Sequence, residues 1–208
     1  MRSSIGTSKP QRTACTPVMG YNPRDLTTGE SISDSAGITF PTASSLKLAV
    51  LVTPLRQAQE GKIGLAQEIT IHRNQTVAGS GILYMLEDGA VHLSWRDVGK
   101  VTVFLGDNST INILIDRLRI DDINGESRRL GLAHTLLQPH MMDLKATQVG
   151  HEDVSTPEKL SQLLEKVYDG QALDSAKTKD CLMKQIDSER KIACDDFVVS
   201  RTGSAGPA

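Results

Sequence analysis

Apolar side chains recur at helical spacing through the centre of the chain. An apolar residue at every third or fourth position is the pattern of a helix with one buried face. The pattern predicts helices over 45–61, 92–105, a segment that begins at Asn108, a segment from Pro157 to Gly170, and 177–186. Pro54 lies within the first of these helices and is expected to kink or shorten it.

Capping residues indicate where three of these helices begin. Ser94 followed by Asp97 has the spacing of a capping box, and Asn108 is predicted to be the N-cap of the next helix. Thr156 supplies a capping hydroxyl directly before Pro157, which suits the first helical position.

Extended segments are predicted near the two ends of the chain. Turn residues separate short extended pieces over 21–40, residues 68–72 alternate weakly, and residues 197–199 are β-prone. Residues 77–86 are predicted to form a glycine-bounded loop that leads into a short helix, and 131–155 a long loop. This distribution favours an α+β fold in which both termini build a sheet lobe around a helical insertion.

The chain is long enough for one domain with a real core. Of its 208 residues, 1–20 are expected to form a poorly ordered tail and 21–208 a single domain. We assign a sheet lobe to about 21–43 and 195–208, and a helical lobe to about 48–194.

Composition excludes some classes of partner. The formal net charge of -2 gives no electrostatic reason to expect a nucleic acid or an anionic membrane. No stretch is long enough to span a membrane, and 1–20 contain no apolar run of signal-peptide length. As written, the chain is expected to be cytoplasmic; the alternative is that the true N-terminus differs.

Cysteine and histidine spacing suggests no metal site and no cofactor. Cys15, Cys181 and Cys194 match neither a disulfide framework nor a zinc pattern, and we favour reduced thiols over a Cys181–Cys194 bridge. His140 and His151 could meet in the long loop, but no carboxylate at ligand spacing accompanies them.

The first candidate for chemistry is the segment FPTASSLKLAVL at 40–51, in which Ser44 and Lys47 have S-x-x-K spacing. Residues three apart share one face of a helix, so the lysine amine lies one turn from the serine hydroxyl. The positive end of a helix favours a developing alkoxide and disfavours a charged lysine, which helps the lysine act as a base. On its own this motif is common, and a solvated lysine at a helix start would explain it.

Further motifs follow in a fixed order. Gly106-Asp107-Asn108 precedes the apolar run INILIDRL, and VAGSGIL lies upstream. LGLAHTLL, MMDLKA and STPEKLSQLLEKVYDG lie downstream, and Arg201-Thr202-Gly203 comes last. In this order, residues 20–203 resemble the class A β-lactamase and penicillin-binding superfamily of serine hydrolases, whose motifs are S-x-x-K, S-D-N and K-T-G.

The resemblance implies a two-lobed fold, an antiparallel sheet lobe beside an all-helical lobe, with the active site between them. Ser44 would open the β-lactam ring and form an acyl-enzyme, Lys47 would accept or relay its proton, and Asn108 would bind the substrate amide. The backbone N–H groups of Ser44 and Ser204 would form the oxyanion hole. The remaining substrate-binding residues would be Arg201, Thr202, Gly203 and Ser204.

This chain departs from the family pattern at three site positions. Gly106 replaces the serine that passes a proton to the leaving nitrogen, and Arg201 replaces a lysine. Met141 aligns with the loop glutamate that activates the deacylating water, and the nearest carboxylates are those of Asp143 and Glu152.

The chain also ends at Ala208, where the family continues through further strands and a terminal helix, so the sheet is expected to be incomplete at the C-terminus of a fragment or decayed copy. β-Lactamase-type hydrolysis stands first among the functions. The alternatives are a catalytically impaired or inactive family fragment and a D-alanyl carboxypeptidase- or esterase-like penicillin-binding protein. We expect a small-molecule β-lactam or peptidoglycan-like substrate, no nucleic-acid or membrane partner, and a monomer.

Overall fold

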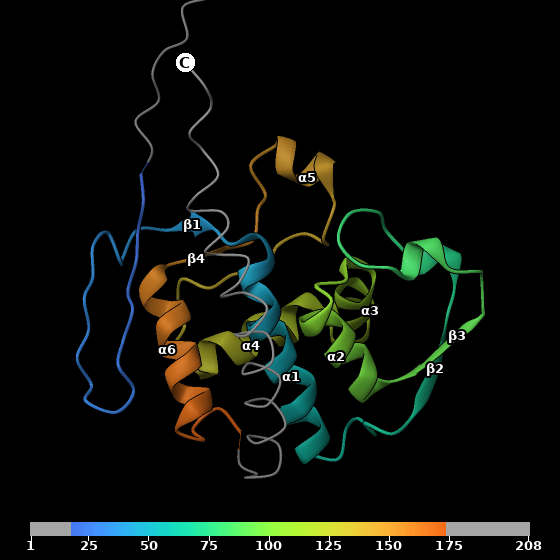
Figure 1. Cartoon of the computed structure of the whole chain (residues 1–208), viewed down its shortest axis with the longest axis horizontal. Coiled ribbons are helices and arrows are strands. Elements are labelled where there is room, and N and C mark those ends of the chain that lie inside the picture. The colour runs from blue at the N-terminus through green and yellow to red at the C-terminus, as the bar shows by residue number, and fades with distance from the viewer. Residues whose placement is uncertain (1–17, 174–208) are drawn as a thin grey trace, which may run out of the picture.

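The computed structural model describes residues 18–173, which form helices and small antiparallel sheets (Figure 1). This confirms the α+β fold class. The predicted helix over 177–186, the predicted strand over 197–199 and the sheet-lobe segment 195–208 lie outside the described residues. The helices are α1 (Lys47–Gln59), α2 (Trp95–Phe104), α3 (Asn108–Leu118), α4 (Ile120–Arg129), α5 (Leu144–Gln148) and α6 (Pro157–Tyr168). The strands are β1 (Phe40–Pro41), β2 (Glu68–Ile71), β3 (Val91–Ser94) and β4 (Val154–Ser155), and the 3-10 turns are η1 (Ala43–Leu46), η2 (Arg73–Gln75) and η3 (Leu83–Met85).

Helix α3 forms the centre of the core. Its apolar side chains are buried on nearly every face, because α1, α2 and α4 all pack against it. The helix α1 crosses α2 closely, and a methyl group built on Gly99 would lie 2.8 Å from Leu51 Cδ1. Pro54 lies inside α1, which runs on to Gln59. No helix among residues 18–173 combines the length and apolar character that crossing a bilayer requires.

The pairing of β2 with β3 confirms one predicted strand and corrects one predicted helix. Residues 92–94 belong to a strand, so the helix predicted over 92–105 begins only at Trp95. Ile69 faces Leu93 in the antiparallel register, and the strand-like segment predicted at 68–72 is confirmed as β2. Ser94 ends the strand and caps α2, accepting a hydrogen bond from Asp97 N at 3.2 Å, as its spacing predicted.

The segment 131–155, predicted to be a plain loop, contains helix α5 and strand β4. Strand β4 pairs with β1 directly before the first helical turn, with Phe40 opposite Ser155. Asn124 on α4 holds the same loop through both backbone groups of Leu137, at 2.8 and 2.9 Å. The loop therefore acquires order from contacts with distant residues, which its own sequence does not show.

The N-terminal part of the described chain lies along α6 (Figure 1). Arg24 donates to Glu165 at 2.6 Å, and Ser161 donates to the carbonyl of Asn22. The helix α6 itself begins after Thr156, whose hydroxyl accepts from Lys159 N, and ends before Gly170, as predicted.

Candidate active site

Ser44 lies in the 3-10 turn η1, which runs directly into α1. The preceding residue, Ala43, has a φ of 44°, a left-handed conformation that is costly for a residue with a Cβ. Strand β1 and the turn fix the approach to this point, because Thr42 N donates to the carbonyl of Asp153 at 2.8 Å. The Ser44 side chain is exposed. The chain therefore presents a serine hydroxyl at the positive end of a buried helix.

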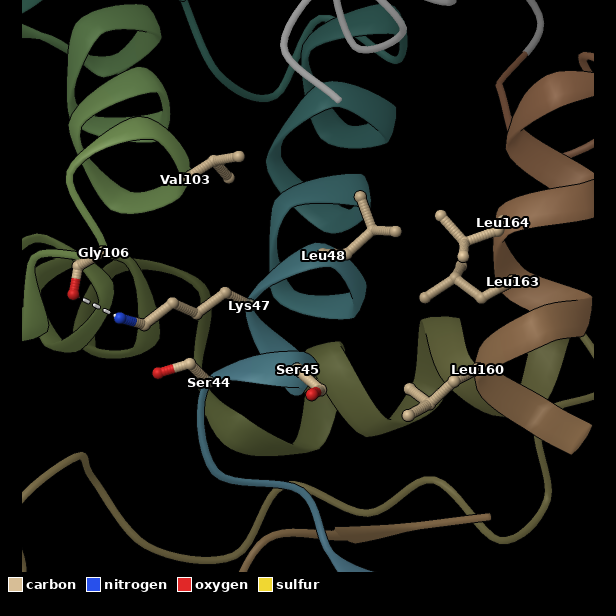
Figure 2. Close-up of a pocket in the computed structure, with 9 residues that line it drawn as sticks. All are labelled: Ser44, Ser45, Lys47, Leu48, Val103, Gly106, Leu160, Leu163 and Leu164. Atoms are coloured by element: carbon tan, nitrogen blue, oxygen red, sulfur yellow. Dashed lines mark hydrogen bonds between the residues drawn. The ribbon is translucent and has the colours of Figure 1, made fainter. Parts of the chain in front are cut away.

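Lys47 is buried at the first position of α1, with 5% of its surface exposed. Its amine donates to the carbonyl oxygen of Gly106 and to Asn108 Oδ1, the latter at 3.3 Å. Figure 2 shows the Ser44 hydroxyl and the Lys47 amine on the same side of a cavity, with the bond to Gly106 dashed. The structure thus brings Ser44, Lys47 and Asn108 together, as the motif order predicted.

The corner at 106–108 is held by Asp107. Its carboxylate is fully buried, and Oδ1 accepts from the backbone N–H groups of Ser109 and Thr110 at 2.8 and 3.0 Å. Its Oδ2 accepts from Ile82 N and Leu83 N at 2.8 and 3.1 Å. Asp107 is therefore the N-cap of α3, and the prediction that Asn108 caps this helix is wrong. A capping carboxylate one residue earlier leaves the Asn108 side chain to contact Lys47.

Glycines allow the close approaches at this corner. A Cβ built on Gly81 would lie 2.0 Å from Asp107 Oδ2, so no larger residue fits against the carboxylate. Gly106 has a φ of 60°, which glycine adopts without strain. A Cβ at Gly106 would lie 3.8 Å from Lys47 Nζ, so a serine at this position would direct its hydroxyl into the neighbourhood of the amine.

The cavity beside Ser44 has a volume of about 460 Å³ and lies between α1, the end of α2 and α6 (Figure 2). Its polar groups come from the serines and Lys47, and its opposite wall consists of leucines. Leu163 is buried in that wall, whereas Leu164 is 42% exposed. The lining residues are Ser44, Ser45, Lys47, Leu48, Val103, Gly106, Leu160, Leu163 and Leu164.

The loop residue Met141 is fixed by Asn112 of α3. Asn112 Nδ2 donates to the Met141 carbonyl at 3.1 Å, and Asn112 Oδ1 accepts from Met141 N at 2.8 Å. The Met141 side chain packs against the core and brings no acid or base. Asp143, one of the two nearest carboxylates in the sequence, is exposed and caps α5 by accepting from Ala146 N.

Asp153 is a buried carboxylate that sequence reasoning missed. Only 7% of it is exposed, and burial raises its pKa from 3.8 to about 6 against the opposing effects of the Gln138 N–H and of His140. Gln138 N donates to Asp153 Oδ1 at 2.8 Å. No local pattern marks a buried carboxylate, because its surroundings come from strand β1 and the loop.

Several predicted site residues lie outside the described residues. These are Arg201, Thr202, Gly203 and Ser204, together with all three cysteines. His140 Nε2 donates to Asp116 Oδ1 at 2.7 Å, and no group of three potential metal ligands gathers within residues 18–173.

One protein family matches most of the chain. The model of the "Beta-lactamase enzyme family" matches residues 13–195, which is most of the 208-residue chain. The chain belongs to the beta-lactamase enzyme family. The matched range includes Ser44, Lys47 and the 106–108 corner. None of the curated proteins searched matches the sequence.

Solved structures of class A β-lactamases and related proteins share the fold of this family member. A beta-lactamase from Sphaerobacter thermophilus matches with a TM-score of 0.74 and 24% identity, over 80% of this chain and 62% of that one. A beta-lactamase from Chitinophaga pinensis gives 0.74 and 25%, over 80% and 62%. PBP-A gives 0.69 and 24%, over 80% and 59%. The chain thus spans about three-fifths of the length of these proteins.

Proposed function

We propose that this chain is a serine hydrolase of the β-lactamase type, in which Ser44 opens the β-lactam ring and becomes acylated. One observation carries the proposal. An exposed serine lies at the start of α1, and the buried Lys47 amine one turn away is held by the Gly106 carbonyl and Asn108 Oδ1. Family membership supports the same chemistry.

The Lys47 amine is held beside Ser44. It donates to the Gly106 carbonyl and to Asn108 Oδ1, and it lines the same cavity as Ser44. In its neutral form, an amine in this position accepts the proton from the serine hydroxyl as the hydroxyl attacks.

Acylation needs no reactant besides Ser44, Lys47 and the β-lactam. Ser44 Oγ forms a bond to the lactam carbonyl carbon, the ring C–N bond breaks, and the serine proton reaches the ring nitrogen through Lys47. The family's S-D-N serine normally passes that proton, and Gly106 has no hydroxyl with which to do so. We therefore assign both proton transfers to Lys47, and we expect slower acylation than a complete S-D-N motif supports.

A second candidate function is that of a penicillin-binding protein, whose acyl-enzyme persists. The observation that favours it is Met141, which Asn112 fixes at the loop position where a deacylating glutamate is expected. A thioether cannot activate water. Hydrolysis of the ester would then depend on solvent alone, and the adduct would decay slowly.

Intact-protein mass spectrometry after incubation with benzylpenicillin tests the proposal. Acylation adds the full mass of the penicillin, because ring opening releases no leaving group. We expect the adduct in the native chain and in Ser45→Ala, a control serine that lines the same cavity, and none in Ser44→Ala. Lys47→Met, which keeps the buried volume, should slow labelling about 100-fold or more.

The lifetime of the adduct separates the two candidates. Rapid loss with release of penicilloate indicates a β-lactamase, whereas an adduct that persists indicates a penicillin-binding protein. Absence of an adduct from a chain shown to be folded by circular dichroism would refute both and leave an inactive family member.

A further inference from the structure

A second cavity lies at the junction of α1, α3 and α4. Its volume is about 560 Å³, and it shares no described lining residue with the cavity beside Ser44. Apart from Gly125, every described residue that lines it has a polar or charged side chain. Polar side chains covered by a ligand need hydrogen-bonding partners on that ligand. The cavity therefore suits a ligand with several hydrogen-bonding groups.

Thr53 lines this cavity and has a hydroxyl without a partner. Only 3% of the residue is exposed, and its Oγ1 forms no hydrogen bond with any residue that the structure describes. A helical threonine usually donates to a carbonyl three or four residues earlier, and an unpaired buried hydroxyl destabilises the native state. A polar ligand group at this point would complete the hydrogen bonding of Thr53.

Gly125 keeps another part of the cavity wall open. It lies inside α4, where glycine is unfavourable because it loses more backbone entropy on folding than any other residue. Apart from its own helix, a Cβ built on Gly125 would meet only Arg128 Nη2, at 3.8 Å. A longer side chain at this position would therefore extend into the space of the cavity.

The exposed residues that line the cavity form its mouth, and they carry an excess of carboxylates. Lys62 Nζ pairs with Glu60 Oε2 at 2.7 Å. Glu60, and after it Asp122, raise the pKa of the Lys62 ammonium, so Asp122 faces the same cation. Asp121 and Asp122 lie in the first turn of α4, are exposed, and form no ion pair within residues 18–173. This edge of the cavity attracts a cationic group.

The two arginines that line the cavity are engaged elsewhere. Arg56 Nε lies 3.8 Å from Glu126 Oε1, and Arg56 Nη2 donates to the Ala172 carbonyl at 2.8 Å. The guanidinium carbon of Arg117 lies 5.9 Å from the ring centroid of Trp95, which does not line this cavity. The unpaired charge at the mouth is therefore negative.

We propose that this cavity binds an amino sugar in its ammonium form, with the ammonium group at Asp121 and Asp122 and a ring hydroxyl at Thr53. The sugar hydroxyls supply the partners that a polar wall needs, and the protonated amine supplies the positive charge. A metal ion does not fit, because no three potential ligands gather to hold one within residues 18–173. The site goes beyond the proposed function, since it uses neither Ser44 nor Lys47.

Titrations followed by amide shifts in ¹H–¹⁵N spectra test the site with four related probes. D-Glucosamine has the ring hydroxyls and the charge, whereas D-glucose and N-acetylglucosamine have the hydroxyls without the charge. Cyclohexylamine has the charge on a ring without hydroxyls. At one low ionic strength, and at a pH where both amines are protonated, glucosamine should bind about fivefold or more tightly than each other probe.

Two variants should weaken binding without weakening the fold. Thr53→Val removes the unpaired hydroxyl, so it should raise the urea unfolding midpoint of the free protein and weaken glucosamine binding about three- to tenfold. Gly125→Leu improves helix propensity and fills the cavity, so it should keep or raise the midpoint and abolish binding. Ser44→Ala should bind glucosamine as the native chain does, which separates this site from the proposed function.

The charge of the mouth is tested by combining Asp121→Asn with Asp122→Asn. This double variant should weaken glucosamine binding about two- to tenfold. Asp143→Asn is the control, an exposed carboxylate outside the cavity, and should leave binding unchanged.

Several results would overturn the proposal. They are the absence of a saturable shift, equal affinity for glucosamine and any other probe, and unchanged binding in Thr53→Val, in Gly125→Leu or in the double variant.

Discussion

Replacing Asp107 by asparagine should release one of the two backbone segments that its carboxylate holds together beside Asn108. The carboxylate accepts four backbone hydrogen bonds while it is fully buried, two from the start of α3 and two from Ile82 and Leu83. Asparagine has one oxygen, so it can satisfy only one of these pairs. Its NH₂ group must then face the two N–H donors of the other pair.

The expected cost follows from the number of bonds lost. A hydrogen bond to a charged group contributes about 1.5–3 kcal/mol, and a buried donor left unsatisfied costs a similar amount. Losing two such bonds should lower the free energy of unfolding by about 3–6 kcal/mol. Asp143→Asn is the control, because Asp143 caps the exposed helix α5 with one hydrogen bond and should cost far less.

Urea denaturation gives the free energies, and native-state hydrogen exchange shows which pair is lost. In Asp107→Asn, the amides of either Ile82 and Leu83 or Ser109 and Thr110 should exchange faster, and the other pair should stay protected. Two results would contradict this prediction. One is that all four amides keep their protection in Asp107→Asn, and the other is that Asp107→Asn lowers the free energy of unfolding no more than Asp143→Asn does.

Three further predictions concern the same architecture. Burial raises the pKa of Asp153 to about 6, so its ionised form destabilises the native state above that pH, and this penalty disappears as the pH falls toward the unfolded value of 3.8. Asp153→Asn, which keeps an acceptor for the Gln138 N–H, should therefore raise the free energy of unfolding by up to about 3 kcal/mol at neutral pH. The gain should be smaller at about pH 4, and urea titrations at the two pH values measure the difference. Gly81→Ala should cost more than about 3 kcal/mol because of its overlap with Asp107, whereas Gly29→Ala, with φ of 76° and nothing within 4 Å, should cost about 1–2 kcal/mol; equal losses would contradict the overlap. Asn112→Ala should expose the loop to limited proteolysis and cost about 1–3 kcal/mol; an unchanged cleavage rate would contradict its clamping role.

Local chemistry made much of the fold and half of the site predictable from the sequence. The capping hydroxyl of Thr156 and the stop at Gly170 locate α6, because a helix end is decided by a few adjacent residues. The spacing of Ser44 and Lys47 placed both at one helix start for the same reason. The order of the motifs then predicted that Asn108 would join them, as it does.

Contacts between distant segments decided the rest. Both Asp107 and Asn108 are good N-caps, and only the amides of Ile82 and Leu83 determine that the carboxylate takes the cap and the amide turns to Lys47. Strand β3 exists because β2 lies beside it, and a four-residue strand next to a helix has no periodicity of its own.

The conformation of the loop that contains Met141 and Met142 also depends on contacts with distant segments. The sequence predicted that Met141 stands where the family carries a catalytic carboxylate. It could not determine that Asn112 would fix Met141, that Met142 would adopt a left-handed backbone beside Asn108, or that Asp153 would be buried. A side chain's direction and the polarity of its surroundings depend on every segment that packs around it, and only the tertiary structure brings those segments together.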